Sequence, residues 1–169
     1  GFIGSAFIRN VGKYPENEII NIDKITYAAN RKNLPKKMNA NYKLYNIDIV
    51  KTSKLKIIMK RFKPDAVLHF AAESHVDRSI SNADEFIKTN IVGTYSILEV
   101  IRYSLESYTK KQKKKFRFIH ISTDEVYGDI RKGKSSIEED QYMPSSPYAA
   151  SKAAADQLVS AWIKTYKIP

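Results

Sequence analysis

Two stretches decide how this chain is interpreted: Phe118-Ile-His-Ile-Ser-Thr-Asp-Glu-Val-Tyr-Gly128 and, after a polar loop, Tyr148-Ala-Ala-Ser-Lys152. Residues 116–121 are rich in aromatic and β-branched side chains, which predicts a buried strand. Ligands of open α/β sheets bind beyond the carboxyl ends of the strands. The residues that leave this strand are therefore expected at a binding site: Thr123, Asp124 and Glu125.

Tyr148 and Lys152 are four residues apart, so a helix places both on one face. A phenol has a pKa of about 10 and is a poor base at neutral pH. A lysine ammonium within about 4–6 Å stabilises the phenolate and lowers this pKa. The spacing therefore predicts that Tyr148 is a general base assisted by Lys152.

Asp124 and Glu125 add a second pair of proton-transfer groups. Adjacent residues leaving a strand point in different directions, so the two carboxyls can reach neighbouring atoms of a substrate. Elimination of water across two carbons needs one base and one acid. An isolated Asp-Glu pair is more often a solvated turn, and an isolated Tyr-x-x-x-Lys an exposed helix pair. Their joint occurrence, with Thr123 before the acids, favours an active site.

Composition restricts the class of protein. The chain has 169 residues, 43% of them hydrophobic, and no cysteine. This size fits one domain with a real core, and the missing thiols exclude disulfides and cysteine nucleophiles. With no apolar run of about 18 residues and no leader, we expect a cytoplasmic protein that does not contact a membrane. The three histidines lack metal-type spacing, so we expect structural roles and no metal: His69, His75 and His120.

The formal net charge is +11, with basic patches at Arg31–Lys37 and Lys110–Lys115. Neither patch interleaves aromatic residues as single-strand binders do. The second patch lies between an expected helix and an expected strand, so we interpret it as a solvated connection. The charge is interpreted mainly as a solubility feature that also favours anionic ligands, and no nucleic-acid partner is expected.

The chain opens with Gly1-Phe-Ile-Gly4 at the mouth of an expected helix, similar to the back half of a dinucleotide-binding loop. Asp23 ends an expected strand over residues 18–23, about 20 residues beyond the glycines. This is the position of the acid that binds the adenosine ribose. An acid there repels a 2′-phosphate, so NAD is preferred over NADP.

Strand and helix patterns alternate along the rest of the chain. Further strands are expected over residues 42–47 and 66–70, and helices over 53–62, from Asn82 through Leu105, and from Tyr148 to about Tyr166. Residues 70–79 are small and polar, and we expect them to form a loop that lies along a cofactor. This alternation predicts an α/β fold with a doubly wound, parallel, Rossmann-type sheet.

These motifs resemble the extended short-chain dehydrogenase/reductases and, within them, the dTDP-glucose 4,6-dehydratase family. The glycines and Tyr-x-x-x-Lys mark only the superfamily. The more specific marks are Ser122-Thr-Asp-Glu-Val-Tyr-Gly128 and Ala71-Ala-Glu-Ser-His-Val-Asp-Arg-Ser79. Related epimerases lack the two adjacent acids. The resemblance covers essentially the whole chain.

The resemblance implies a lyase that uses NAD to oxidise C4 of a nucleotide sugar, eliminates water across C5–C6 and returns the hydride to C6. The resemblance implies that Tyr148, assisted by Lys152, takes the proton from the C4 hydroxyl. Glu125 would remove the C5 proton and Asp124 would protonate the C6 hydroxyl. Thr123 and Ser74 would bind the sugar. Implied cofactor contacts, beside the glycines, Tyr148 and Lys152, are Phe2, Ile3, Asp23, Lys24, Ile25, Thr26, Asp48, Ile49, Phe70, Ala71, Ala72, Glu73, Ser74 and Thr89.

Against this family the chain lacks the first strand, the first glycine and the C-terminal nucleotide-sugar domain. We therefore expect residues 1–169 to be an NAD-binding domain truncated at both ends, inactive alone, from a protein that is a homodimer at full length. The alternatives are a UDP-glucose 4,6-dehydratase or a nucleotide-sugar 4-epimerase. A non-catalytic NAD-binding protein is a further alternative, and it would be expected to have lost the catalytic side chains.

Overall fold

The computed structural model describes residues 1–34, 41–130 and 133–169. The chain forms two compact units, Gly1–Ile49 and Val50–Pro169, and each is described here by itself. Pro35, Lys36 and Lys37, part of the first predicted basic patch, lie outside the described residues.

The first unit pairs two strands in parallel. Ile19 lies opposite Tyr42 and Asp23 opposite Asn46, so both strands end at the same edge. The strands predicted over residues 18–23 and 42–47 are therefore confirmed within one residue. In chain order the elements are α1 (Phe2–Val11), β1 (Ile19–Asp23), the 3₁₀ turn η1 (Arg31–Asn33) and β2 (Tyr42–Asn46).

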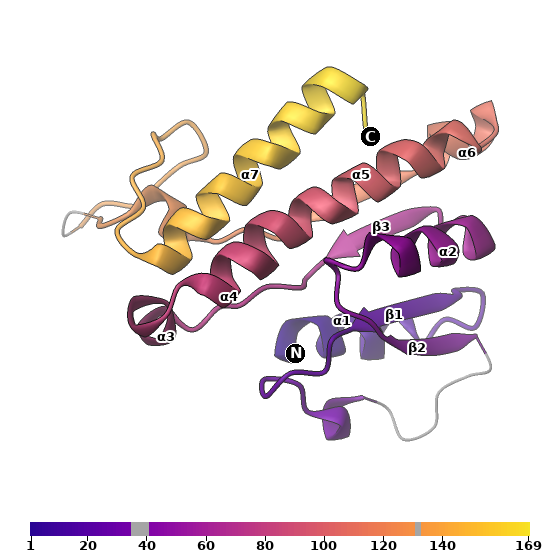
Figure 1. Cartoon of the computed structure of the whole chain (residues 1–169), viewed down its shortest axis with the longest axis horizontal. Helices are drawn as coiled ribbons and strands as arrows, with labels where there is room; N and C mark the ends of the chain where they lie inside the picture. The colour runs from indigo at the N-terminus through magenta and orange to yellow at the C-terminus, as the bar shows by residue number, and fades with distance from the viewer. Residues whose placement is uncertain (35–40, 131–132) are drawn as a thin grey trace. The chain divides into compact units, whose positions relative to one another are not determined.

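The second unit contains a second parallel pair of strands, with His69 opposite His120. Helices α5 and α7 lie side by side in this unit (Figure 1). Its elements are α2 (Thr52–Phe62), β3 (Ala66–His69), α3 (Val76–Ser81), α4 (Asp84–Phe86), the π-helix η2 (Ile87–Val92), α5 (Gly93–Glu106), α6 (Lys110–Lys115), β4 (Arg117–His120), the 3₁₀ turn η3 (Asp124–Tyr127) and α7 (Pro147–Tyr166).

The core of the second unit forms where α5 and α7 pack together. The Oγ atom of Ser146 accepts the amide N–H of Ala149 at 3.0 Å, and Pro147 occupies the first turn of α7, so this helix begins with two favourable start signals. Alanines on α7 allow close approach of its neighbours. The fully buried apolar side chains include Leu98, Val100, Ile101, Phe116 and Val126.

The predicted α/β class with parallel strands is confirmed. The described residues form two separate two-stranded sheets, β1–β2 and β3–β4, so the sheet is incomplete as predicted. No helix in the described parts of the chain is both long and apolar enough to cross a bilayer.

Two segments predicted as loops are helical. Lys110–Lys115 is helix α6, because Thr109 and Gln112 form a reciprocal capping box that the charge pattern obscured. The polar segment after His75 forms α3, in which the buried Ser79 hydroxyl donates to the carbonyl of Val76 at 2.6 Å. Local polarity therefore gave the wrong secondary structure at both places.

Gly128 ends η3 in a conformation that only glycine adopts readily, with φ 77° and ψ −154°. A Cβ added there would lie 2.0 Å from the carbonyl oxygen of Met143. The amide N–H of Met143 in turn donates to the carbonyl of Val126 at 3.0 Å. Gly128 therefore holds the end of η3 against the loop that leads to α7.

We predict that Gly128→Ala destabilises the protein far more than Gly133→Ala. Gly133 also has a positive φ, of 78°, but an added Cβ would meet nothing within 4 Å. The control should lower the free energy of unfolding by about 1–2 kcal/mol from backbone strain alone. Gly128→Ala should lose at least about 3 kcal/mol, since strain and overpacking add. Urea unfolding of both full-length variants checks this, and equal losses would contradict the close contact with Met143.

Candidate active site

Helix α7 positions the predicted tyrosine. Tyr148 is only 8% exposed, and its ring packs edge-on against Phe86 with 6.3 Å between the ring centroids. The amide N–H of Tyr148 donates to the Oγ of Ser79 at 3.1 Å. Tyr148 is thus fixed at the first turn of α7 by both its ring and its backbone.

Lys152 attaches α7 to the end of β4. Its side chain is almost completely buried, and Nζ donates to the carbonyl oxygen of Ile121 at 2.6 Å. Ile121 directly follows the last residue of the strand. A buried ammonium must be hydrogen-bonded to be tolerated, so this contact fixes the position of α7 relative to the strand end.

The two predicted acids lie on the 3₁₀ turn η3 and are exposed. Thr123 caps this turn: its Oγ1 accepts the amide N–H of Glu125 at 3.3 Å and donates to Oδ1 of Asp124 at 3.3 Å. Successive side chains of a 3₁₀ helix point about 120° apart. The two carboxyls therefore diverge as expected, although on a helical turn and not on extended chain.

The structure brings Thr123, both acids and Tyr148 together. Burial raises the pKa of the Tyr148 phenol, a hydrogen bond with Thr123 opposes this, and the charges of Glu125, Asp124 and Asp156 raise the pKa further. The net shift is upward, opposite to the direction predicted from the Lys152 spacing. That prediction was wrong because spacing along a helix does not reveal burial or the surrounding carboxylates.

Burial lowers the pKa of Lys152, and the charge of Asp156 opposes this shift. Both residues of the tyrosine–lysine pair are thus shifted toward their neutral forms. Perturbed titration of buried groups beside exposed acids is typical of a catalytic site.

The predicted cofactor segment Phe70–Ser74 is tied to the helices by Asn90. Its Oδ1 accepts the amide N–H of Glu73 at 2.9 Å, and its Nδ2 donates to the carbonyl of Glu73 at 2.9 Å. The same Nδ2 donates to the Oγ of Ser151 on α7 at 2.8 Å. Asn90 lies in the π-helix η2, directly after Thr89, and is 2% exposed.

Sequence reasoning assigned no role to Asn90, Ser151 or Asp156. An asparagine inside an otherwise helical segment was the available signal for Asn90, because asparagine is unfavourable there without a specific partner. A π-helix cannot be recognised from hydrophobic periodicity. The partners of Ser151 and Asp156 are distant in sequence and left no local pattern.

In the first unit, the predicted adenosine residues lie at the ends of β1 and β2. Oδ1 of Asp23 accepts the amide N–H of Ile25 at 2.7 Å, and Oδ2 lies 3.6 Å from the nitrogen of Gly1. Nζ of Lys24 pairs with Oδ2 of Asp48 at 3.0 Å. Ile25 has a φ of 54°, a strained value for a β-branched residue. Thr26 and Ile49 follow in the same two segments.

The start of α1 fits an anionic group. The described residues include no side chain that caps this helix, so its first amide N–H groups remain available for a ligand. Phe2, Ile3 and Gly4 lie in this first turn, directly after Gly1.

Two of the histidines have structural partners. Nε2 of His69 lies 3.0 Å from Oγ1 of Thr94, and burial, with the nearby His120 and Lys152 charges, lowers the pKa of His69 to about 3. Nε2 of His120 lies 3.0 Å from a carboxylate oxygen of Asp156. Among the residues that the structure describes, no group of three or more His, Asp or Glu side chains could hold a metal ion.

Known proteins share both sequence and fold with this chain. A family profile described as GDP-mannose 4,6 dehydratase matches residues 1–169. A dTDP-glucose 4,6-dehydratase of Haemophilus influenzae is 50% identical over 171 residues, which cover 100% of this chain and 51% of the relative. One of Neisseria gonorrhoeae is 48% identical, with 100% and 49% coverage. The chain thus spans about half the length of the curated relatives it matches.

Solved structures agree with these relatives. The dTDP-glucose 4,6-dehydratase DesIV of Streptomyces venezuelae, crystallised with NAD and TYD bound, is 41% identical with a TM-score of 0.87, covering 99% of this chain and 50% of that one. A UDP-glucose 4-epimerase of Thermus thermophilus in complex with NAD is 25% identical with a TM-score of 0.83, at 99% and 50% coverage. Dehydratases and epimerases therefore share this fold.

Proposed function

The chain belongs to the family described as GDP-mannose 4,6 dehydratase, and on this premise we propose that its full-length protein is a lyase that converts dTDP-glucose to dTDP-4-keto-6-deoxyglucose. One observation carries the proposal: the adjacent acids of η3 lie close enough to the buried Tyr148 to shift its pKa. A base for oxidation and an acid–base pair for elimination then belong to one site.

The identity of the nucleotide sugar rests on the relatives. The predicted resemblance to dTDP-glucose 4,6-dehydratases is confirmed, since eight curated relatives of that name are 44–50% identical to this chain. Inversion at C4 loses no water and needs no acid pair, so Asp124 and Glu125 favour a dehydratase over an epimerase. A UDP-glucose 4,6-dehydratase is the remaining alternative, and a UDP-sugar assay separates the two.

We propose NAD as the cofactor. By the family resemblance, its phosphates would bind at Gly1–Gly4 and its adenosine at Asp23–Thr26 and Asp48–Ile49. The residues for the nicotinamide side would be Phe70–Ser74, Thr89, Tyr148 and Lys152. When bound, NAD supplies the acceptor for a hydride from C4 of the sugar and its later donor to C6.

Tyr148 would accept the proton of the C4 hydroxyl. Thr123 already contributes a hydrogen bond that lowers the pKa of Tyr148. Lys152, in its protonated form, would stabilise the phenolate that forms. Thr123 and Ser74 would orient the sugar by hydrogen bonds near C4. The 4-keto group that results acidifies the neighbouring C5–H bond.

Glu125 would then remove the C5 proton while Asp124 donates a proton to the departing C6 hydroxyl. The C5–H and C6–O bonds break, a C5–C6 double bond forms, and water leaves. Because the two carboxyls diverge from one turn capped by Thr123, they can act on adjacent carbons of the same sugar.

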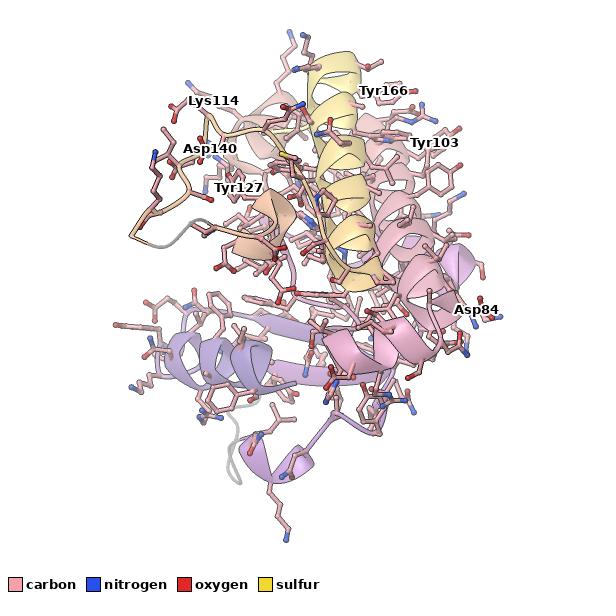
Figure 2. The ribbon with its side chains drawn as sticks, turned by 90° about the vertical axis from the view of Figure 1, so that its left-hand side faces the viewer. Asp84, Tyr103, Lys114, Tyr127, Asp140 and Tyr166 are labelled. Atoms are coloured by element: carbon pink, nitrogen blue, oxygen red, sulfur yellow. The ribbon has the colours of Figure 1, made fainter. Side chains whose placement is uncertain are left out.

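We also propose a cytoplasmic homodimer. Its support is an aromatic face over α5 and α7, where Tyr95, Tyr103 and Tyr166 are between 45% and 47% exposed. Tyr103 and Tyr166 project on the same side of the two helices (Figure 2). Exposed aromatic side chains that gather on one face are typical of an interaction surface.

Glu125→Gln should separate oxidation from elimination in the full-length protein. Oxidation at C4 does not use this carboxylate, so reduced cofactor should still appear at 340 nm after dTDP-glucose is added. Water loss and exchange of the C5 proton with solvent deuterium should fall by about 10²–10⁴-fold, the usual contribution of a general base. C5 exchange at the wild-type rate would exclude Glu125 as the base. Tyr148→Phe is the matched control, since it keeps the packing and should lose both steps.

We further propose that residues 1–169 alone are inactive and bind NAD poorly. The two separate strand pairs support this, because strand edges without a neighbouring strand are prone to pair with other chains and aggregate. A purified 1–169 polypeptide that unfolds cooperatively as a monomer and binds NAD with micromolar affinity would contradict this proposal.

A further inference from the structure

Asp156 lies on the same face of α7 as the two proposed catalytic residues, one turn beyond Lys152 and two turns beyond Tyr148. Its side chain is 11% exposed, although it carries a carboxylate. Buried carboxylates require several hydrogen-bond donors. The donors to Asp156 come from two segments that lie apart in the sequence, the end of β4 and the loop before α7.

Three side chains donate to this carboxylate. Nε2 of His120, the last residue of β4, lies 3.0 Å from Oδ1. The hydroxyl of Ser122 donates to Oδ2 at 2.5 Å, and that of Tyr142 donates to the same oxygen at 3.1 Å. Burial acts to raise the pKa of Asp156, but the hydrogen bonds from His120 and Ser122, the charge of His120 and the bond from Tyr142 lower it overall. The ionised form is therefore the stable one.

These donors flank the acid turn η3 on both sides. Ser122 immediately precedes Thr123, which caps the turn. Tyr142 packs edge-on against Tyr127, the last residue of the turn, with 5.3 Å between ring centroids and an interplanar angle of 89°. One carboxylate thus fastens the entry and, through two tyrosine rings, the exit of the turn to α7.

We propose that Asp156 is a positioning residue for the elimination step, which holds Asp124 and Glu125 at a fixed place relative to Tyr148 by binding Ser122 and Tyr142. This inference rests on the proposed function. Specifically, a residue of α7, the helix that carries Tyr148, would fix the positions of Asp124 and Glu125. A merely structural His120–Asp156 pair would support both halves of the reaction equally.

The charge of Asp156 gives the inference a second observable. Tyr148 is faced by the carboxylates of Glu125, Asp124 and Asp156, each of which raises the pKa of its phenol. Asp156 itself is faced by His120, Tyr142 and Lys152. Removing only the charge of Asp156 lowers the pKa of Tyr148, so the low-pH limb of C4 oxidation should move to lower pH.

The test compares Asp156→Asn, Ser122→Ala and Tyr142→Phe in the full-length protein, with Asp140→Asn as the control. Asp140 is an exposed acid in the loop before α7, where its Oδ2 accepts the amide N–H of Ile137 at 3.0 Å. Single-turnover absorbance at 340 nm measures C4 oxidation, and exchange of the C5 proton in deuterated water measures elimination chemistry.

We expect Asp156→Asn to slow C5 exchange by about 10–100-fold, since a misplacement of about 1 Å can cost this much. C4 oxidation should stay within about threefold of wild type, with its acid limb at lower pH. Ser122→Ala and Tyr142→Phe should slow C5 exchange in the same direction but leave the pH limb in place, because they keep the charge. Asp140→Asn should change neither rate.

Equal slowing of both steps in all three variants, or no change in either step, would overturn the positioning role. If Asp156→Asn fails to fold, Ser122→Ala and Tyr142→Phe decide the question by the ratio of the C5 exchange rate to the C4 oxidation rate. A wild-type protein that removes no water from dTDP-glucose would instead refute the proposed function, and the inference with it. If the wild type dehydrates dTDP-glucose but the variants keep the wild-type ratio of C5 exchange to C4 oxidation, only the inference is refuted.

Discussion

The attachment of α7 to the carboxyl end of β4 is the constraint on which the second unit depends. The buried ammonium of Lys152 donates a hydrogen bond to the carbonyl of Ile121. The carboxylate of Asp156 accepts hydrogen bonds from the side chains of His120 and Ser122. Opposite charges one turn apart on α7 thus hold the same strand end. A charge left unpaired in either position would carry a large desolvation cost, so the helix has one favourable position.

This attachment separates two chemical environments over a short distance. Tyr148 is buried, with its ring against Phe86 of α4 and its amide bonded to Ser79 of α3, and its pKa is raised. Asp124 and Glu125, in contrast, are exposed on a turn capped by Thr123. A 25% identical epimerase shares this fold, so the fold alone does not separate a dehydratase from an epimerase. In the proposed function, the two acids on η3 supply the acid–base pair for elimination of water.

The sequence predicted the parallel strands closely, because short runs rich in β-branched or aromatic residues end at polar residues, as at Ile19–Asp23 and in residues 116–121. The proposed tyrosine–lysine and acid pairs could be recognised in the sequence, because their spacing is local. Sequence reasoning missed α6, where a run of lysines hid the capping box of Thr109 and Gln112. Contacts between residues far apart in the sequence left no local pattern, since the hydrogen-bond donors to Asp156 lie 14–36 residues away from it. The raised pKa of Tyr148 could not be predicted either, because it depends on burial.

The transfer of the C4 hydrogen is the most direct test of the central claim that one site performs oxidation, elimination and reduction. Full-length protein should be incubated with dTDP-glucose that carries deuterium at C4, and the product examined by mass spectrometry and NMR. The account predicts one deuterium in the C6 methyl group of a 4-keto-6-deoxy sugar, a solvent hydrogen at C5 and no free reduced cofactor. Deuterium that remained at C4 of an unchanged or inverted sugar, or that was released in free reduced cofactor, would contradict it.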